Sequence, residues 1–402
     1  MRRPDPALLV VLGGVSAALH VGKLAPAIPV LQQALGIGLV EAGFLLSLVQ
    51  LAGMALGLVV GLAADGLGLR RTMVTGLAVL CVASALGATA TSAPALMVLR
   101  AIEGLGFLLA SMPAPSLIRL LVKPERMSRM LGLWGAYMPF GTACALLAGP
   151  LLIASIGWQG WWLVLSAISA VMGMWLWIAL PPDPTRAAAS HARSEWSDRL
   201  ARTLRAPGPW LVALCFSVYS AQWLAVIGFL PSVYARAGLS PALAGVATAL
   251  AAAVNMSGNI ASGRLLHAGI RAQALLYIGF AAMGLGGFFT FSDAAAILDP
   301  QRGAFWRYAA VLVFSSVGGL IPGTLFSLAV QLAPDEHTVS TSVGWLQQWS
   351  AAGQLAGPPL VAWVATRTGG WEWSWLVTSS CALAGLLLST LVGRLLEPRA
   401  PL

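Results

Sequence analysis

The sequence predicts an all-α membrane protein with twelve transmembrane helices in two pseudo-symmetric six-helix bundles. Of its 402 residues, 58% are hydrophobic and 9% are charged, whereas soluble domains are about 45–50% apolar and about 25% charged. An apolar excess of this size needs lipid to cover it, which excludes a water-soluble fold. The apolar residues form continuous runs rather than alternating strand segments, so a transmembrane barrel is excluded as well.

Charged residues, prolines and glycines divide the chain into apolar runs that are each long enough to cross a bilayer as a helix. One polar interruption, residues 181–209, is much longer than the rest and separates the runs six and six. We therefore expect an amino-terminal bundle (1–180), a cytoplasmic central loop (181–209) and a carboxyl-terminal bundle (210–402). The expected spans are residues 7–31, 40–63, 72–91, 95–121, 130–153, 159–180, 210–235, 241–265, 272–292, 306–331, 339–365 and 374–396.

The net charge of +9 reports membrane topology rather than affinity for nucleic acid. With the amino terminus in the cytoplasm, seventeen of the 23 Lys and Arg residues fall on the cytoplasmic side. The positive-inside rule thus predicts a bacterial inner-membrane protein with both termini in the cytoplasm. The first span shows no signal-peptide cleavage pattern, so we expect it to be retained. We expect a monomer that contacts lipid and binds no nucleic acid.

The two halves of the chain share a short sequence pattern in corresponding spans. Residues 157–164 and 370–377 both read G-W-[QE]-x-x-W-L-V. The pair Gly149-Pro150 in the fifth span is matched by Gly357-Pro358 in the eleventh, and both pairs are candidate helix-bending positions. Tryptophans at span entries also serve as interfacial anchors, but the same order in matching spans favours an internal duplication.

The sequence carries no signal for an enzyme, a metal or a cofactor. There is no HExxH, G-x-S-x-G or P-loop pattern, and the four histidines are scattered. The four cysteines lie singly in separate apolar runs, which is typical of packing residues. They are Cys81, Cys144, Cys215 and Cys381.

A glycine-rich turn with one acid and two bases joins the second and third spans. Its marked positions are Gly61, Asp65, Gly68, Arg70 and Arg71. Glycine lets two helix ends approach closely, and an acid at this place pairs with an arginine or a helix amino terminus. The loop resembles the signature loop of the major facilitator superfamily, although Leu69 stands where a base is often found. Within the superfamily, the chain resembles bacterial cyanate/nitroimidazole-type carriers.

The resemblance covers essentially the whole chain and implies a secondary transporter whose two halves rock about a central site, with the signature loop as a conformational switch. It implies that Asp65 helps to latch the halves, so Asp65→Asn should reduce transport without preventing membrane insertion. The corresponding loop of the second half, residues 258–264, has no acid, so its latch must be weaker or built differently.

Three ionisable residues in the first and fourth spans, Lys23, Arg100 and Glu103, lie at one depth. Lys23 is roughly 12 Å from the outer end of its span, and Arg100 and Glu103 are roughly 8–12 Å from the outer end of theirs. Arg100 and Glu103 are one turn apart, and His20 precedes Lys23 by three residues. The resemblance implies that both spans line the central path, where the four residues meet with a net charge of +1.

Two interpretations of these residues remain open. In the functional one, Lys23 and Arg100 attract a carboxylate or similar anion, and Glu103, or else His20, carries a coupling proton. We favour Glu103, because burial opposes its ionisation while the nearby cations favour it, and Glu103→Gln should then uncouple transport from protons. In the structural one, a buried ion pair orders two helices and Lys23 snorkels to the outer interface.

The second half offers amide and aromatic side chains in place of charge. Tyr219, Gln222 and Trp223 lie on one face of the seventh span, which the resemblance places along the cavity. Further binding candidates are Tyr137 in the fifth span and Gln347 in the eleventh. Asn255 and Asn259 in the eighth span are more typical of interhelical hydrogen bonding.

These features predict a secondary active transporter that moves a small organic anion or zwitterion by alternating access, coupled to protons and without a cofactor. A multidrug efflux proton antiporter is the alternative, since Gly149-Pro150 partly matches the glycine-rich motif of exchangers. The first span has no acid to attract a cationic drug, which argues against efflux. A ligand-binding membrane sensor is a third possibility, and counterflow of a labelled substrate would separate it from a transporter.

Overall fold

In the computed structural model, the chain is helical wherever it forms regular structure within the residues that the structure describes, 5–183, 196–299 and 301–396. Side chains are described there except at residues 61–67, 124–125, 128–129, 131–132, 196 and 296. The chain divides into two compact units, of which one comprises Met1–Arg193 and Ile227–Ala252 and the other comprises Ser194–Val226 and Ala253–Leu402. We call them unit 1 and unit 2. The bundle boundaries expected from the sequence, and most of the central loop within them, stay predictions.

Several helices of unit 1 are interrupted within a membrane span. Prolines cause two of these breaks, because a proline lacks the backbone N–H that the preceding turn needs: Pro26 follows α1, and Pro115 lies in the first turn of α7. The elements up to the central loop are α1 (Pro6–Gly22), η1 (Ala25–Ala27), α2 (Ile28–Leu35), α3 (Leu39–Ser47), η2 (Leu48–Gln50), α4 (Leu51–Leu67), α5 (Leu69–Gly87), α6 (Ala93–Ser111), α7 (Ala114–Leu121), α8 (Pro124–Gly135) and α9 (Tyr137–Ala179).

The second part of the chain repeats this pattern of long and divided helices. The eighth span divides into α12 and α13 at Val254, and the tenth into α16 and α17 at Gly319. The elements are α10 (Trp196–Arg205), α11 (Pro207–Arg236), α12 (Pro241–Ala253), α13 (Asn255–His267), α14 (Ala272–Phe291), α15 (Ala294–Leu298), α16 (Gly303–Gly318), α17 (Leu320–Gln331), η5 (Glu336–Thr338), α18 (Val339–Thr368) and α19 (Trp375–Leu396).

The described helices account for all twelve expected spans. Ten helical segments pass both length and hydropathy criteria for a span. One of them is α9, whose 43 residues make two spans because Gly157 adopts φ +75° and interrupts the helix. The 30-residue α18 is long enough to be the remaining span, the eleventh in chain order, and its serines, glutamines and tryptophans explain its lower hydropathy.

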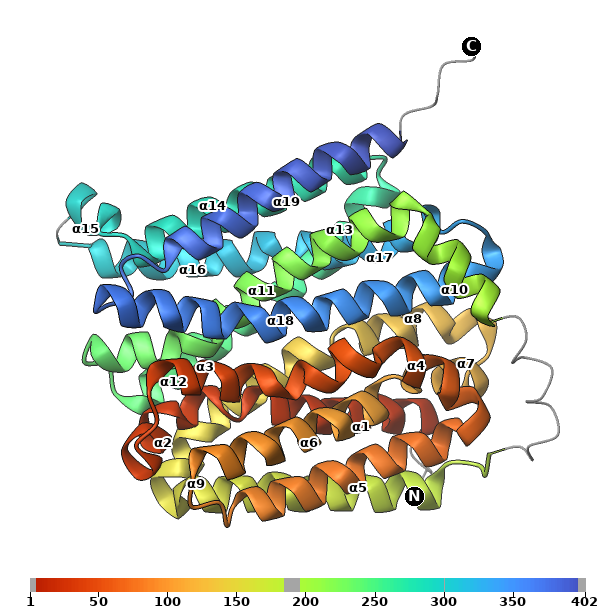
Figure 1. Cartoon of the computed structure of the whole chain (residues 1–402), viewed down its shortest axis with the longest axis horizontal. Coiled ribbons are helices and arrows are strands. Elements are labelled where there is room, and N and C mark those ends of the chain that lie inside the picture. Colours follow the sequence, from red (N-terminus) through yellow and green to blue (C-terminus); the bar gives the residue numbers. More distant parts are fainter. Residues whose placement is uncertain (1–4, 184–195, 300, 397–402) are drawn as a thin grey trace. The chain divides into compact units, whose positions relative to one another are not determined.

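Glycine contacts bring the helices of each unit into close packing, as is typical in membranes. In unit 1, a Cβ on Gly104 of α6 would lie 2.6 Å from the Val49 carbonyl oxygen of η2. In unit 2, a Cβ on Gly286 of α14 would lie 2.8 Å from Phe314 Cβ of α16. Figure 1 shows α5 beside α6 and α9 in unit 1, and α14 beside α19 in unit 2. The close approach of α1, α6 and α9 brings the polar side chains of unit 1 together.

Candidate functional site

The candidate site begins at the break that follows α1. The last carbonyls of a helix lose their intrahelical partners, and here other helices supply the missing donors. Arg100 Nη1 donates to the His20 carbonyl (2.6 Å) and Arg100 Nη2 to the Val21 carbonyl (3.4 Å). The indole Nε1 of Trp161 on α9 donates to the Lys23 carbonyl (3.1 Å). The break in the first span is therefore held by side chains from α6 and α9.

Arg100 also reaches a second helix end. Its Nε donates to the carbonyl of Leu45 in the last turn of α3 (3.1 Å). One guanidinium thus joins two interrupted helices. Its five donors in a fixed fork suit this task better than the ammonium of a lysine. Arg100 is 1% exposed, so this arrangement lies deep inside unit 1.

Glu103 is bonded to both buried cations. Its Oε2 accepts from Arg100 Nη1 at 2.7 Å, and its Oε1 accepts from Lys23 Nζ. The carboxylate is 2% exposed, and removing it would leave two buried cations with no counter-charge in this cluster. Breaking a buried ion pair by removing one partner costs about 3–5 kcal/mol.

Lys23 is enclosed on three sides and does not extend to the outer interface. Besides Glu103, its Nζ donates to Ser84 Oγ of α5 (2.9 Å) and stands 4.5 Å from the ring centroid of Trp162. Ser84 Oγ donates in turn to the Trp162 carbonyl (3.0 Å). The residue is 0% exposed, so the structure excludes the snorkelling orientation for Lys23.

His20 completes what we call the charge cluster, namely His20, Lys23, Arg100 and Glu103. Its Nε2 lies 2.8 Å from Ser169 Oγ of α9. Its Nδ1 is buried without a hydrogen-bond partner among the described residues and lies 3.9 Å from Glu103 Oε1. With a neutral imidazole, two cations and one carboxylate give the cluster a charge of +1. An unbalanced charge in a membrane interior is costly and typical of functional sites.

The aromatic and amide residues of unit 2 form a separate, uncharged network. Asn255 Nδ2 of α13 donates to the Tyr219 hydroxyl of α11 (3.0 Å) and to the Ser315 carbonyl of α16 (2.8 Å). Trp223 Nε1 donates to Ser315 Oγ (3.2 Å). Asn255 therefore bonds between helices, as its sequence context suggests, whereas Asn259 bonds back to Asn255 within α13 (3.0 Å).

The remaining predicted binding residues lie in different surroundings. Gln222 is 0% exposed, and neither its Oε1 nor its Nε2 has a partner among the described residues. Gln347 on α18 is exposed. Tyr137 stacks on Trp134 (ring centroids 4.0 Å apart) beside Gly14, which lies six residues, or about 9 Å, before His20 on α1. The structure thus joins the four ionisable candidates but leaves Tyr137 outside their hydrogen bonds.

The signature loop is a turn of one residue, because α4 ends at Leu67 and α5 begins at Leu69. Asp183, just after α9, accepts from the backbone N–H groups of Arg70 (2.9 Å) and Arg71 (3.0 Å). The Arg70 guanidinium lies over the Trp177 ring (4.3 Å) and donates to the Trp177 carbonyl. The acid that the sequence predicts to act in this loop is Asp65, and its side-chain contacts, like the surroundings of Gly61, lie outside what the structure describes.

The two Gly-Pro pairs lie inside helices and make tight contacts there. A Cβ on Gly149 of α9 would lie 2.6 Å from Pro26 Cγ, next to the break in the first span. Pro150 contacts Gly245 of α12 within unit 1. In unit 2, Gly357 of α18 lies against the Ala221 carbonyl of α11, and Pro358 follows it. The interruption of α9 itself lies at Gly157, seven residues beyond Pro150.

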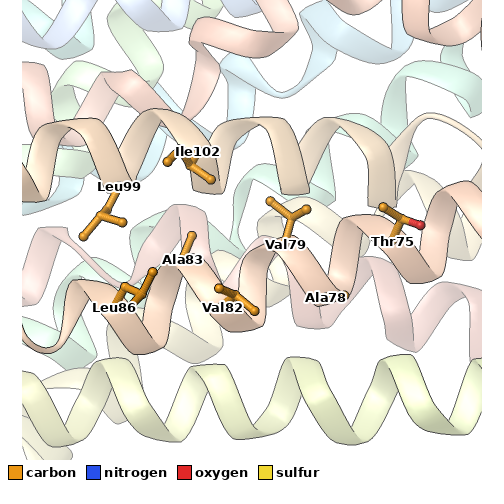
Figure 2. Close-up of a pocket in the computed structure, with 8 residues that line it drawn as sticks. All are labelled: Thr75, Ala78, Val79, Val82, Ala83, Leu86, Leu99 and Ile102. Carbon is orange, nitrogen blue, oxygen red and sulfur yellow. The ribbon is translucent and has the colours of Figure 1, made fainter.

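Two surface grooves of unit 1 have no residue of the charge cluster in their lining. One of them has a volume of about 370 Å³ and lies between α5 and α6, lined by Val82, Leu86, Leu99 and Ile102 among others (Figure 2). Apart from Thr75 its lining side chains are apolar, and Val82 is 58% exposed. These properties fit the lipid-facing surface of a membrane helix pair. Among the described residues, no group of His, Cys, Asp and Glu is placed to bind a metal.

Sequence reasoning missed the neutral partners of the cluster, Ser84, Ser169 and Trp162. The signal for Trp162 was present, because it belongs to the repeated G-W-[QE]-x-x-W-L-V pattern. The serines carry no such signal, since small hydroxyl residues are common in membrane helices and their partners depend on helix rotation.

An all-helical chain with twelve spans, internal breaks and a buried charge cluster defines a multi-pass membrane protein. The sequence model of the Major Facilitator Superfamily matches residues 10–348. The chain belongs to this superfamily and is a transporter rather than an enzyme, as the sequence predicted.

Individual relatives agree with this assignment. The 2-nitroimidazole transporter of Escherichia coli (strain K12) is 26% identical over 266 residues, which cover 63% of this chain and 62% of that protein. Among solved structures, a bacterial homologue of the human lysosomal transporter Spinster superposes with a TM-score of 0.76, at 16% identity over 100% of both chains. The xylose transporter XylE from E. coli gives 0.72, at 14% identity over 98% of this chain and 99% of that one. These two structures support the fold alone.

Proposed function

We propose that the protein is a proton-coupled secondary transporter of a small organic anion or zwitterion, working by alternating access in the bacterial inner membrane with both termini in the cytoplasm. The observation that carries this proposal is the charge cluster. Two cations share one carboxylate in a site that is almost completely closed to solvent. A bound anion would balance the excess positive charge.

The two cations of the cluster have different tasks in this proposal. Arg100 is committed to three backbone carbonyls at two helix breaks, so it holds the site together. Lys23 bonds to side chains alone, namely Ser84, Glu103 and the face of Trp162. A flexible ammonium can exchange such partners more readily than a guanidinium fixed on backbone groups. Lys23 is therefore the proposed anion-binding residue and Arg100 the positioning residue.

Glu103 and His20 are the proposed proton-handling residues. Glu103 holds Lys23 and Arg100 together through its two oxygens. His20 has an open basic nitrogen within 3.9 Å of the same carboxylate. Imidazole is the side chain that most readily changes charge near neutral pH.

From unit 2, Gln222 is the candidate for substrate contact. Its buried and unpartnered amide costs stability unless something pairs with it at another stage of transport. Tyr219 and Trp223 are occupied by Asn255 and Ser315, so their proposed contribution is to hold α11, which carries Gln222, against α13 and α16. Tyr137 and Gln347 remain secondary candidates.

A thermal-unfolding screen of the purified protein at pH 5.5 and 7.5 tests the substrate class. The probes are benzoate as an organic anion, 2-nitroimidazole as the relative's substrate, and tetraphenylphosphonium as a lipophilic cation. A ligand at 100 times its Kd stabilises the folded state by about 2.7 kcal/mol. Stabilisation by benzoate in the wild type but not in Lys23→Ala supports the proposal, with Arg367→Ala as the control for loss of an exposed cation.

Two results would count against an anion carrier. Stabilisation by tetraphenylphosphonium alone would favour a multidrug efflux antiporter. Equal stabilisation of wild type and Lys23→Ala by benzoate would show that the charge cluster is not part of the binding site. Counterflow of the stabilising probe in proteoliposomes then distinguishes a carrier from a membrane sensor, because a sensor binds ligand without exchanging it across the bilayer.

A further inference from the structure

His20 and Lys23 face the same oxygen of Glu103. Lys23 Nζ donates to Oε1, and His20 Nδ1 lies 3.9 Å from that atom. The other oxygen, Oε2, is bonded to Arg100. One carboxylate oxygen is therefore within reach of two groups that can each carry a positive charge.

The present partners of the imidazole leave that nitrogen open. Nε2 is paired with Ser169 Oγ at 2.8 Å, and a neutral ring with its proton on Nε2 leaves Nδ1 as a bare acceptor. Nδ1 has no partner among the described residues. Ser16, one turn earlier on α1, also has a buried hydroxyl without a described partner, and the i, i+4 spacing puts both groups on one face of the helix.

We propose that protonation of His20 at Nδ1 transfers Glu103 Oε1 from Lys23 to His20 and thereby frees the Lys23 ammonium to bind the substrate anion. The proton comes from water and ends on Nδ1, whose N–H then donates to Oε1. Lys23 keeps its hydrogen bond to Ser84, and the N–H that it donated to Glu103 becomes available for a substrate carboxylate. When His20 loses the proton, Lys23 returns to Oε1 and displaces the anion. This inference rests on the proposed function and deepens it.

Charge counting fits this exchange. The cluster carries +1 with neutral His20, +2 after protonation, and +1 again when a monoanion joins Lys23. Proton and anion together restore the starting charge, so each stabilises the other in the site. The cycle predicts the electroneutral uptake of one proton with each monovalent anion.

The groups around His20 set the conditions of the exchange. Lys23 on its own helix and Glu103 and Arg100 on α6 are the charged groups that act on it. From α9 it meets the uncharged Ser169 hydroxyl and the Leu165 carbonyl. From α5, α7 and α8, which also pack against α1, no described charged side chain acts on it. Glu103 is thus the acid toward which a protonated His20 turns.

Trp162 offers a direct probe, because Lys23 Nζ stands 4.5 Å from its ring centroid. The full chain is labelled with 5-fluorotryptophan, and its ¹⁹F spectrum is recorded from pH 8 to pH 5, with Trp162→Phe assigning the resonance. We expect the Trp162 resonance to shift with falling pH in the wild type and in His267→Gln, a control at an exposed histidine. The shift should be lost in His20→Gln, which keeps a donor for Ser169 but cannot take up a proton.

Ser169→Ala is a second test that does not depend on the folding of His20→Gln, because it keeps the titrating ring and removes the bond to Nε2. In this variant the shift should persist with a displaced midpoint. A Trp162 resonance that does not move in the wild type overturns the proposal, as does a shift of equal size in His20→Gln. Neither result depends on transport, so the proposed function can fail or hold independently.

Discussion

The two units bring their helices together with different chemistry. Unit 1 buries two cations, a carboxylate and an imidazole, whereas unit 2 connects α11, α13 and α16 through a phenol, an indole, an amide and a serine. Both networks join three helices or more. A bundle of this fold is thus held together in unit 2 with neutral hydrogen bonds, which carry a much smaller desolvation cost than buried charges.

Folding alone therefore does not account for the charges of unit 1. A bundle that could use Asn and Ser for the same purpose retains Lys23 and Glu103 at a cost in stability, which points to a role in transport. Arg100 is the exception within the cluster, because it pairs the carbonyls at two helix breaks. Variants that change one group at a time separate these roles.

Glu103→Gln should destabilise unit 1 most, by about 3–5 kcal/mol, because it leaves two buried cations without a carboxylate. It should also abolish proton-driven transport. Thermal unfolding in detergent measures the first effect and a pH-sensitive dye inside proteoliposomes measures the second. Glu372→Gln, at an exposed site in the second half of the chain, is the control. A folded, fully coupled Glu103→Gln protein would contradict the functional role of the cluster.

Arg100→Lys should be nearly as harmful, although it keeps the charge. A lysine cannot pair the carbonyls of both breaks, and each buried carbonyl left unpaired costs about 1–3 kcal/mol. Thermal unfolding is the measurement, with Arg126→Lys at an exposed ion pair as the control. If Arg100→Lys unfolds at the wild-type temperature, the helix breaks do not depend on the guanidinium fork.

Gly68→Ala should cost about 1–3 kcal/mol through backbone strain and displacement of Asp183. Gly68 has φ +92°, and a Cβ there would lie 2.5 Å from Asp183 Oδ2. Gly238→Ala is a matched control, because Gly238 has φ +82° with nothing within 4 Å of the added atom. In a double-mutant cycle, Gly68→Ala should cost less once Asp183 is alanine. Additive costs would show that the cap on α5 does not constrain the turn.

Asn255→Ala in unit 2 should have a moderate effect of about 0.6–1.7 kcal/mol, from the average to the largest value measured for interhelical hydrogen bonds in a membrane protein. Coupling to protons should remain, because no charge is lost. The same two assays as for Glu103→Gln provide the comparison between the units. Loss of coupling in Asn255→Ala would show that unit 2 takes part in proton handling.

The exposed ion pairs should contribute least, below about 1 kcal/mol each. Unit 1 has Asp5 with Arg126, and unit 2 has Asp335 with Arg202, both at 2.7 Å. Arg126→Ala and Arg202→Ala should lower the unfolding temperature slightly and equally, and high salt should remove the difference from wild type. A large, salt-resistant loss in either variant would contradict this interpretation.

Much of the fold follows from the sequence, because a run of about 20 apolar residues has few alternatives to a transmembrane helix. Depth arithmetic likewise predicts one layer for Lys23, Arg100 and Glu103, with His20 one turn from Lys23, and the structure brings the four together. The breaks within spans are harder to predict from the sequence. Proline predicts that a helix is interrupted at Pro26, but the way Arg100 and Trp161 pair the freed carbonyls depends on helix rotation and tertiary contacts.

The partners of the signature loop also could not be predicted from the sequence. Asp183 lies more than 110 residues from the N–H groups that it caps, and a surface acid next to prolines gives no indication of such a contact. In unit 2 the hydrogen-bonding character of Tyr219, Gln222 and Trp223 was visible. Which of them remains unpaired depends on the side chains of α13 and α16, and this information enters only with the folded structure.

The double variant Lys23→Met/Glu103→Gln tests whether the buried charges of unit 1 serve substrate binding rather than folding. It removes one cation and the carboxylate together, so the cluster keeps its charge of +1 through Arg100. Its unfolding temperature, measured with and without the organic acid that best stabilises the wild type, separates folding from binding. We predict a midpoint well above that of Glu103→Gln, close to the wild type, and no further rise with the acid. A midpoint as low as that of Glu103→Gln, or a wild-type response to the acid, would contradict the account.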